Sequence, residues 1–309
     1  MPHQIVIVGV GKIARDQHLP AITANPDFDL AATASRNAQV GGVPAYNDLA
    51  SLLEAQEHVT CVSLCTPPQA RYGDARLALE AGRHVMLEKP PGATLSEVQD
   101  LVDLAASKGL TLYATWHSRH AAAVAEAKAW LADKAIHKLD IQWKEDVRYW
   151  HPGQGWIWQP GGLGVFDPGI NALSVLTEIY PRALHLSQAE LRFPENRDTP
   201  VAADLTFHDA GGAQVTAAFD WLHVGPPCWD IHIETDAGTA VLSEGGAVFA
   251  IDGNPPEAGT EMAGEYPSLY ARFADLIAAG QSEADLSPMR HVADAFTLGR
   301  RSVVAPFEW

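Results

Sequence analysis

The stretch Ile5-Val6-Ile7-Val8-Gly9-Val10-Gly11-Lys12-Ile13-Ala14 decides the fold of this chain. Its apolar, β-branched first half predicts a buried strand, and its second half matches the pattern G-x-G-x-x-A at the start of a helix. In this pattern Gly9 permits a tight turn, and Gly11 lets a pyrophosphate approach the backbone N–H groups at the helix N-terminus. The stretch therefore predicts a dinucleotide site, with Gly9, Gly11, Lys12 and Ile13 as candidate contacts.

Beyond this stretch, the first third of the chain alternates short apolar runs with helical patterns, which is typical of βαβ units and a parallel sheet. Thr94 and Glu97 form a capping-box pattern, and the apolar stripe that follows predicts a helix ending at Gly109. The candidate strands after the first one are residues 30–34, 59–65, 84–87 and 111–115.

The second half of the chain has a different pattern, with long alternating strands separated in several places by glycine turns, which favours an antiparallel meander. We therefore expect an α/β chain. Residues 1–118 should form a Rossmann domain with a doubly wound parallel sheet, and residues 119–309 an α+β domain with a large, open, mostly antiparallel sheet. One face of this second sheet stays available for a partner, which is compatible with a homo-oligomer.

Composition narrows the classes of partner and site. A formal net charge of −17 repels nucleic acid and anionic membrane surfaces, so we expect neither as a partner. No apolar run is long enough to span a bilayer and no basic segment precedes the first strand, so we expect a cytoplasmic protein. The three cysteines, Cys61, Cys65 and Cys228, lack zinc-ligand spacing, and we interpret them as core residues in a chain without a metal site.

The end of the second strand bears on the choice of cofactor. An acid there would bind the ribose 2′-OH of NAD and repel the 2′-phosphate of NADP, but the sequence has Ser35 and Arg36. The Arg36 guanidinium can pair with a phosphate and stack on adenine. We therefore expect NADP to be accepted and NAD also, with an exposed loop arginine as the alternative interpretation.

Glu88-Lys89-Pro90-Pro91 follows the apolar run 84–87, and Pro90 cannot extend a strand. Residues at the carboxyl ends of parallel strands line the ligand crevice of an open α/β sheet. Lys89 is therefore predicted to point into a site, and the alternative is a surface lysine that closes a strand.

Two stretches of the second half carry the remaining candidate side chains. Residues 143–152 combine Glu145, Trp150 and His151, a mixture typical of sugar pockets, although a single tryptophan more often fills a core. The glycine-rich residues 161–169 lead into a helix on which Asp167 and Asn171, spaced i and i+4, share one face. Asp167 is a candidate proton acceptor, or alternatively only a helix cap before Pro168.

The glycine turn, Cys65-Thr66-Pro67-Pro68, Glu88-Lys89-Pro90 and the loop with Asp167 together resemble the glucose–fructose oxidoreductase, inositol dehydrogenase and rhizopine catabolism family over the whole chain. Residues 11–20, 115–119 and 143–171 are most similar to its bacterial L-arabinose 1-dehydrogenases, which also take D-galactose. The resemblance implies hydride transfer between a sugar carbon and a nicotinamide. It also implies that Cys65, Thr66, Pro67, Pro68, Glu88 and Lys89 belong to the cofactor site.

The same resemblance implies roles in catalysis. The family commonly has an Asp-x-x-x-His pair, but this chain has Asn171 in place of the histidine, and an amide is not a general base. Lys89 would then polarise the anomeric hydroxyl, Asp167 would accept its proton directly or through Lys89, and Asn171 would orient a hydroxyl. The product would be a lactone, and the implied sugar contacts are Glu145, His117, Trp150 and His151.

Two other functions compete with an L-arabinose 1-dehydrogenase that also accepts D-galactose or D-fucose. One is a dehydrogenase tuned to D-galactose, which needs room for an extra hydroxymethyl group. The other is a sensor that binds dinucleotide and sugar without catalysis. Lys89 and Asp167 argue against the sensor, because binding alone does not need a lysine and a carboxylate suited to proton transfer.

Overall fold

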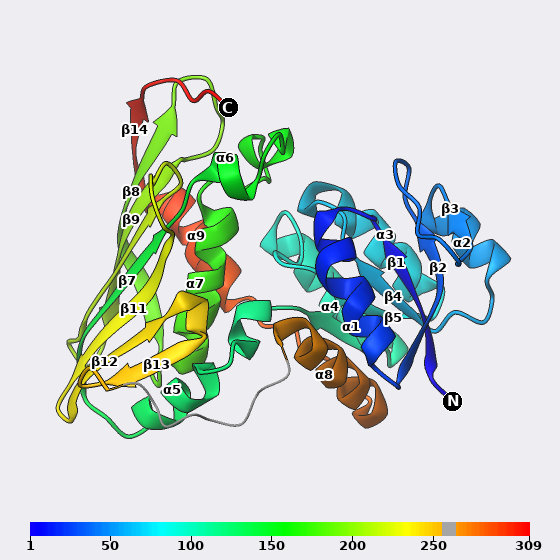
Figure 1. The fold of residues 1–309 in the computed structure, drawn as a ribbon, viewed down its shortest axis with the longest axis horizontal. Coiled ribbons are helices and arrows are strands. Elements are labelled where there is room, and N and C mark those ends of the chain that lie inside the picture. The colour runs from blue at the N-terminus through cyan, green and yellow to red at the C-terminus, as the bar shows by residue number, and fades with distance from the viewer. Residues whose placement is uncertain (255–263) are drawn as a thin grey trace. The chain divides into compact units, whose positions relative to one another are not determined.

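The computed structural model describes residues 1–254 and 264–309, and the chain divides into two compact units (Figure 1). The first unit consists of Met1–His117 and a later segment of the chain that ends at Asp285. The second unit begins at Ser118 and also includes the chain from Leu286 to Trp309. The sequence analysis left everything after residue 118 in the second domain, so the returning segment corrects that boundary.

The returning segment contains helix α8 (Glu265–Ala279), whose apolar side packs on the first sheet. Tyr270 and Phe273 of α8 share a buried cluster with Ile5 and Ile7 of the first strand. The apolar face of an amphipathic helix does not specify which sheet it packs on. The sequence alone therefore did not place α8 in the first unit.

The first unit is built on a six-stranded sheet in the order β3-β2-β1-β4-β5-β6, with every neighbouring pair parallel. The doubly wound Rossmann prediction is confirmed, and the strand order reverses between β1 and β4, where such sheets bind ligands. The strands are β1 His3–Val8, β2 Phe28–Ala34, β3 Ala45–Tyr46, β4 Cys61–Leu64, β5 His84–Leu87 and β6 Leu112–Ala114.

The helices of this unit follow from local signals. Residues 12–24 are helical, as π-helix η1 (Ala14–His18) and α1 (Leu19–Ala24) in their later part. The predicted capping box opens α4, where Thr94 accepts from the Glu97 backbone and Glu97 accepts from the Thr94 backbone. The remaining helices are α2 Leu49–Ala55, α3 Pro68–Glu80 and α4 Leu95–Lys108.

The second unit is built on an eight-stranded sheet in the order β13-β12-β11-β7-β10-β9-β8-β14. It is mostly antiparallel, as predicted, but β10 pairs with β7 in parallel, and β14 pairs with β8 in parallel. Strand β8 was not predicted. The strands are β7 Ile136–Lys144, β8 Leu184–Pro194, β9 Ala202–Asp209, β10 Gln214–Asp220, β11 Cys228–Thr235, β12 Gly238–Ser243, β13 Val248–Ile251 and β14 Arg300–Val304.

Helices α7 and α9 lie against one face of this sheet (Figure 1). Leu139, Ile141 and Trp143 of β7 are buried, while the alternate residues of the strand are more exposed. The unit's helices are η2 His117–His120, which straddles the boundary, α5 Val124–Leu131, α6 Val147–Trp150, η3 Gly155–Trp158, α7 Phe166–Ile179, η4 Glu244–Gly246 and α9 Ser287–Leu298.

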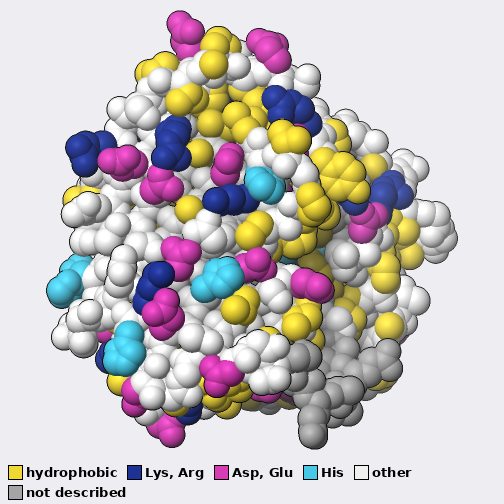
Figure 2. Space-filling model, turned by 60° about the vertical axis from the view of Figure 1, so that its left-hand side comes forward, with side chains coloured by type: hydrophobic (Ala, Val, Ile, Leu, Met, Phe, Trp, Pro, Cys, Tyr) yellow, Lys and Arg dark blue, Asp and Glu magenta, His cyan; other side chains and the backbone are white. Residues whose placement is uncertain are grey.

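The other face of the eight-stranded sheet is polar. Figure 2, in which the side of Figure 1 that bears this sheet comes forward, shows acidic, basic and histidine side chains interspersed. Pairs such as Lys138–Glu234 and Arg192–Asp204 bring opposite charges together. An oligomer through this face stays a prediction. Among the described residues, no helix is long and apolar enough to cross a membrane.

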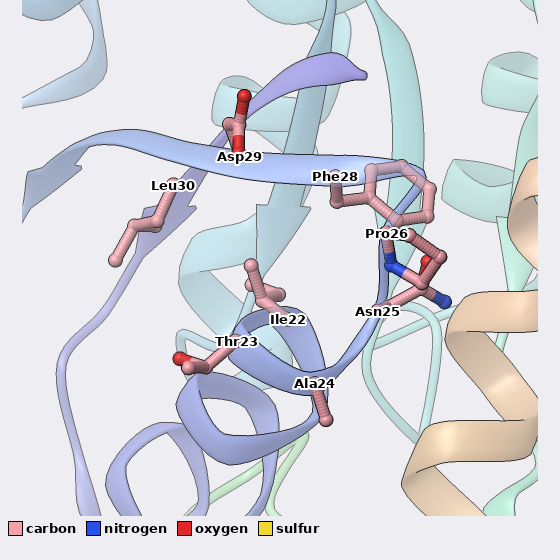
Figure 3. Close-up of a pocket in the computed structure, with 8 residues that line it drawn as sticks. All are labelled: Ile22, Thr23, Ala24, Asn25, Pro26, Phe28, Asp29 and Leu30. Carbon is pink, nitrogen blue, oxygen red and sulfur yellow. The ribbon is translucent and has the colours of Figure 1, made fainter.

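A hollow of about 470 Å³ in the first unit lies between the end of α1 and the start of β2 (Figure 3). Its lining runs from Ile22 to Leu30 and includes Asn25 and Phe28. This is the amino end of β2, whereas the glycine turn follows the carboxyl end of β1. In a parallel sheet these are opposite edges, so the hollow is separate from the predicted dinucleotide site.

Candidate active site

The glycine turn has the geometry that the sequence pattern predicted. Gly9 adopts φ +89°, and a Cβ there would lie 2.8 Å from the Thr66 backbone nitrogen. A Cβ at Gly11 would meet nothing within 4 Å, so space is open beside the turn. The backbone N–H of Cys65 donates a hydrogen bond to the backbone carbonyl of Val8, and this bond holds the loop after β4 against the turn.

The loop after β4 lies against the glycine turn, beside Gly9. The structure thus brings Gly9 together with Cys65 and Thr66, as the family resemblance implied, and Pro68 begins α3. Thr66 Oγ1 is buried and makes no hydrogen bond within the parts of the chain that the structure describes. An unsatisfied hydroxyl beside an open glycine turn fits a phosphate-bearing ligand, because buried polar atoms ordinarily have partners.

The end of β2 carries Ser35, half-buried, and Arg36, exposed. Sequence reasoning missed a neighbour, the carboxyl group of Asp74 in α3. Burial and the charge of Asp48 raise the pKa of Asp74, while the Arg36 charge opposes that rise. Arg36 is therefore within electrostatic reach of an acid that lies about 40 residues further along the chain, where no linear motif points to it.

Lys89 follows the carboxyl end of β5, as predicted, and is half-buried. Its peptide bond to Pro90 is cis. Glu88, which stays a predicted cofactor contact, is buried, and its carboxylate accepts hydrogen bonds from the Lys89 backbone N–H and the Tyr266 hydroxyl. The Glu88 side chain therefore serves the interior of the first unit.

His117, an expected sugar contact, lies in the first unit. Its Nδ1 lies 2.8 Å from Glu265 Oε2, and its ring stacks on Tyr266. The other three expected sugar contacts, Glu145, Trp150 and His151, lie in the second unit.

Glu145 directly follows β7 and is 5% exposed. Trp221 Nε1 donates to its Oε1 at 3.1 Å, and Trp229 Nε1 donates to its Oε2 at 3.0 Å. Trp221 follows β10 and Trp229 lies on β11, so the two indoles come from the strands on either side of β7. Sequence reasoning missed both, because strand neighbours leave no signal in linear spacing.

His151 lies between two buried carboxylates. Its Nε2 is 3.8 Å from Glu145 Oε1 and 3.7 Å from Asp167 Oδ2. Its ring meets the face of Trp221 at an angle of 62°. Trp150, 39% exposed, packs against Trp229 and adds apolar surface. The structure thus brings together an imidazole, two carboxylates and several indoles.

Asp167 is 3% exposed and lies within the first turn of α7. The helix begins at Phe166, and no side chain caps it at Val165. The alternative interpretation of Asp167 as an N-cap is therefore wrong. Asn171 is half-buried one turn later, at the predicted i+4 position. Gly164, at φ +58°, lets the preceding loop approach Thr199 and Pro200 more closely than a Cβ would permit.

The three cysteines differ in burial. Cys61 is buried, and burial raises the pKa of its thiol to about 12. Cys65 is half-buried and packs against the same apolar cluster as Cys61. Cys228 is half-buried. Within residues 1–254 and 264–309, no group of three or more His, Cys, Asp or Glu side chains is placed to hold a metal ion.

Comparison with known proteins gives the same fold and identifies relatives. The chain is 44% identical to a galactose 1-dehydrogenase of Pseudomonas fluorescens, over 99% of each protein. A crystal structure of a D-galactose 1-dehydrogenase from Rhizobium etli is 57% identical, has a TM-score of 0.95, and matches 99% of this chain and 98% of that one. A 3-ketoreductase from Actinomadura kijaniata, solved with NADP and TDP-benzene, shares the fold at 19% identity, with a TM-score of 0.82 and coverage of 98% and 100%.

Residues 3–115, which contain the glycine turn and Glu88-Lys89-Pro90, match the family described as an oxidoreductase family with an NAD-binding Rossmann fold. With relatives this similar over the full length, the chain belongs to the glucose–fructose oxidoreductase, inositol dehydrogenase and rhizopine catabolism family of NAD-binding oxidoreductases.

Proposed function

We propose that this protein is an NAD(P)-dependent aldose 1-dehydrogenase, which oxidises the anomeric carbon of a cyclic sugar to a lactone. The observation that carries the proposal is the cluster of Glu145, His151 and Asp167 beside the indoles of Trp221 and Trp229. Indoles offer apolar faces to sugar rings, while carboxylates and imidazole accept and donate hydroxyl hydrogen bonds.

The names of the galactose 1-dehydrogenases from Pseudomonas fluorescens and Rhizobium etli support D-galactose as the first substrate to test. L-Arabinose and D-fucose share the hydroxyl arrangement of D-galactose around C2 to C4, so we propose them as alternative substrates. The three sugars differ only at the exocyclic carbon.

In this proposal Asp167 accepts the proton of the C1 hydroxyl, and Lys89 stabilises the negative charge that develops on that oxygen. Asn171 orients a neighbouring hydroxyl, because its amide can donate and accept hydrogen bonds but cannot act as a base. Glu145, Trp150 and His151 hold the sugar, and His117 is a further candidate contact. The nicotinamide dinucleotide, when bound at the glycine turn, supplies the acceptor for the C1 hydride.

We propose that NADP is used, with NAD also accepted. Ser35 and Arg36 at the end of β2 support this choice, since neither excludes a 2′-phosphate. The nearby Asp74 carboxyl weakens the positive field of Arg36, so the preference for NADP should be moderate.

The test follows absorbance of the reduced cofactor with D-galactose, L-arabinose and D-fucose, first for the wild type and then for Asp167→Asn. The variant keeps the shape of the side chain, so kcat should fall about 10²–10⁴-fold, the usual contribution of a general base. Dinucleotide affinity, measured by fluorescence titration, should be retained. Asn171→Ala is the matched control on the same helical face and should affect kcat less. Near-normal kcat in Asp167→Asn, or no reduction of cofactor with any aldose, would overturn the proposal.

A further inference from the structure

The backbone around Lys89 is held by a buried guanidinium. Arg71 of α3 is 2% exposed and donates hydrogen bonds to the backbone carbonyls of Thr66, Glu88 and Pro90. Two of these carbonyls flank Lys89 on either side. The planar fork of an arginine can bridge several acceptors in this way, whereas a lysine ammonium is a single point charge.

The buried Glu88 carboxylate binds the backbone N–H of Lys89. Glu88 Oε2 accepts the Lys89 backbone N–H at 2.7 Å. Glu88 Oε1 contacts the Tyr266 hydroxyl at 2.6 Å and His18 Nε2 at 3.2 Å. His18 is fully buried, and its Nδ1 lies 2.8 Å from the hydroxyl of Tyr270.

These contacts shift the pKa values of Glu88 and His18 in opposite directions. Burial alone would raise the pKa of Glu88, but the hydrogen bond and charge of His18 bring it well below its usual range. Burial alone would lower the pKa of His18, but its neighbours, including Cys65 and Tyr270, raise it well above the ordinary value. His18 and Glu88 therefore face each other as a buried acid–base pair, with His18 Nε2 3.2 Å from Glu88 Oε1.

Buried charges cost several kcal/mol each to desolvate, and replacing such groups by apolar ones is often neutral for stability. A loop that merely closes a strand can satisfy its backbone with water. Here Arg71 of α3 binds the carbonyls on either side of Lys89. His18 of η1 and Tyr266 of α8 bind the Glu88 carboxylate, which in turn accepts the Lys89 N–H. The arrangement suits a residue whose position must be precise, since a misplacement of about 1 Å can cost about 10²-fold in rate.

We infer that Arg71 and Glu88, with His18 and Tyr266 behind the carboxylate, are positioning residues that fix the main chain of Lys89 and thereby aim its ammonium group. The inference rests on the proposed function, in which Lys89 stabilises the developing alkoxide. None of the four residues touches the reacting atoms in this scheme. Each acts through Lys89.

The test uses two conservative variants of the full-length protein, Arg71→Lys and Tyr266→Phe. The first keeps the charge but loses the fork, and the second removes one hydroxyl. Both should lower kcat about 10–100-fold, while the dissociation constant of the dinucleotide changes less than about 2-fold. Arg76→Lys is the matched control, because Arg76 lies on the same helix but pairs with Asp100 at the surface. Its kcat should equal that of the wild type.

A second readout does not depend on turnover. The rate at which an amine-reactive reagent acylates Lys89, followed by peptide mass spectrometry over a range of pH, reports the environment of its amine. Both variants should change this rate by about 3-fold or more, because a moved main chain alters the surroundings of the amine. The exposed Lys12 serves as internal control and should react unchanged.

The outcomes separate the inference from the function on which it rests. If Lys89→Ala keeps wild-type kcat, the proposed role of Lys89 fails, but altered labelling in Arg71→Lys and Tyr266→Phe would still show that these groups position it. If Lys89→Ala is inactive while both variants match Arg76→Lys in kcat and in labelling, the inference is wrong and the function stands. Should Arg71→Lys fail to fold, Tyr266→Phe decides alone.

Discussion

Replacing Glu145 by Gln should destabilise the second unit in a way that the structure specifies. Each carboxylate oxygen accepts one indole N–H, at 3.1 Å from Trp221 and 3.0 Å from Trp229. A glutamine has only one oxygen, so in either orientation its amide N–H₂ would face an indole N–H. One charge-assisted bond would be replaced by a neutral one, and the other by two opposed donors.

The magnitude follows from these two losses. A hydrogen bond to a charged group contributes about 1.5–3 kcal/mol, and a buried donor without a partner costs about 1–3 kcal/mol. Relaxation of the half-buried Trp229 offsets part of this cost. We therefore expect Glu145→Gln to lower the free energy of unfolding by about 2–4 kcal/mol. It should also raise the KM for sugar, if Glu145 binds a hydroxyl as proposed.

Urea unfolding followed by tryptophan fluorescence measures this change, because every tryptophan except Trp116 belongs to the second unit. Trp229→Phe supplies the matched partner for a double-mutant cycle. Without the Trp229 indole, the glutamine amide can turn toward that side and oppose no donor. The double variant should therefore be more stable than the sum of the single effects, by about 1–3 kcal/mol. Additive effects would refute the reasoning.

Three further changes test other parts of the structure. Arg36→Ala should raise the KM for NADP about 10-fold or more beyond any change for NAD, because it removes a charge-assisted phosphate contact; equal losses for both cofactors would count against that contact. Gly9→Ala should lower the melting temperature and weaken dinucleotide binding, because its Cβ would meet Thr66 at φ +89°, whereas Gly11→Ala should leave the melting temperature unchanged. The pKa of His18 is raised in the folded state, so its contribution to stability is full below its ordinary value of 6.5 and is lost as pH rises through the raised pKa. Unfolding free energy should fall over that range in the wild type, and His18→Gln should flatten the profile; parallel profiles would contradict the raised pKa of His18.

Local signals in the sequence predicted much of the first unit. The alternation of apolar runs, the glycine turn and the Thr94–Glu97 capping box each act within a few residues, and each is confirmed. The position of Lys89 after β5 followed from the proline that ends the strand. Such features are determined by neighbours in the chain, so one sequence suffices to find them.

The features that sequence reasoning missed depend on residues far apart in the chain. Helix α8 covers the first sheet although it comes after seven of the eight strands of the second sheet in the chain. Glu145 receives its two donors from Trp221 and Trp229 only because β7 lies between β10 and β11, one parallel and one antiparallel to it. Neither pairing produces a period or a spacing that can be read along the chain.

Asp167 shows how the two kinds of information combine. The family resemblance leads one to expect an imidazole one helical turn after this aspartate, but residue 171 is asparagine. The structure supplies an imidazole from another element, since His151, just after α6, has its Nε2 3.7 Å from Asp167 Oδ2. The His151 side chain is 20% exposed, while that of Asp167 is nearly enclosed. In this chain the imidazole beside the aspartate therefore lies on the loop after α6, and not one turn further along α7.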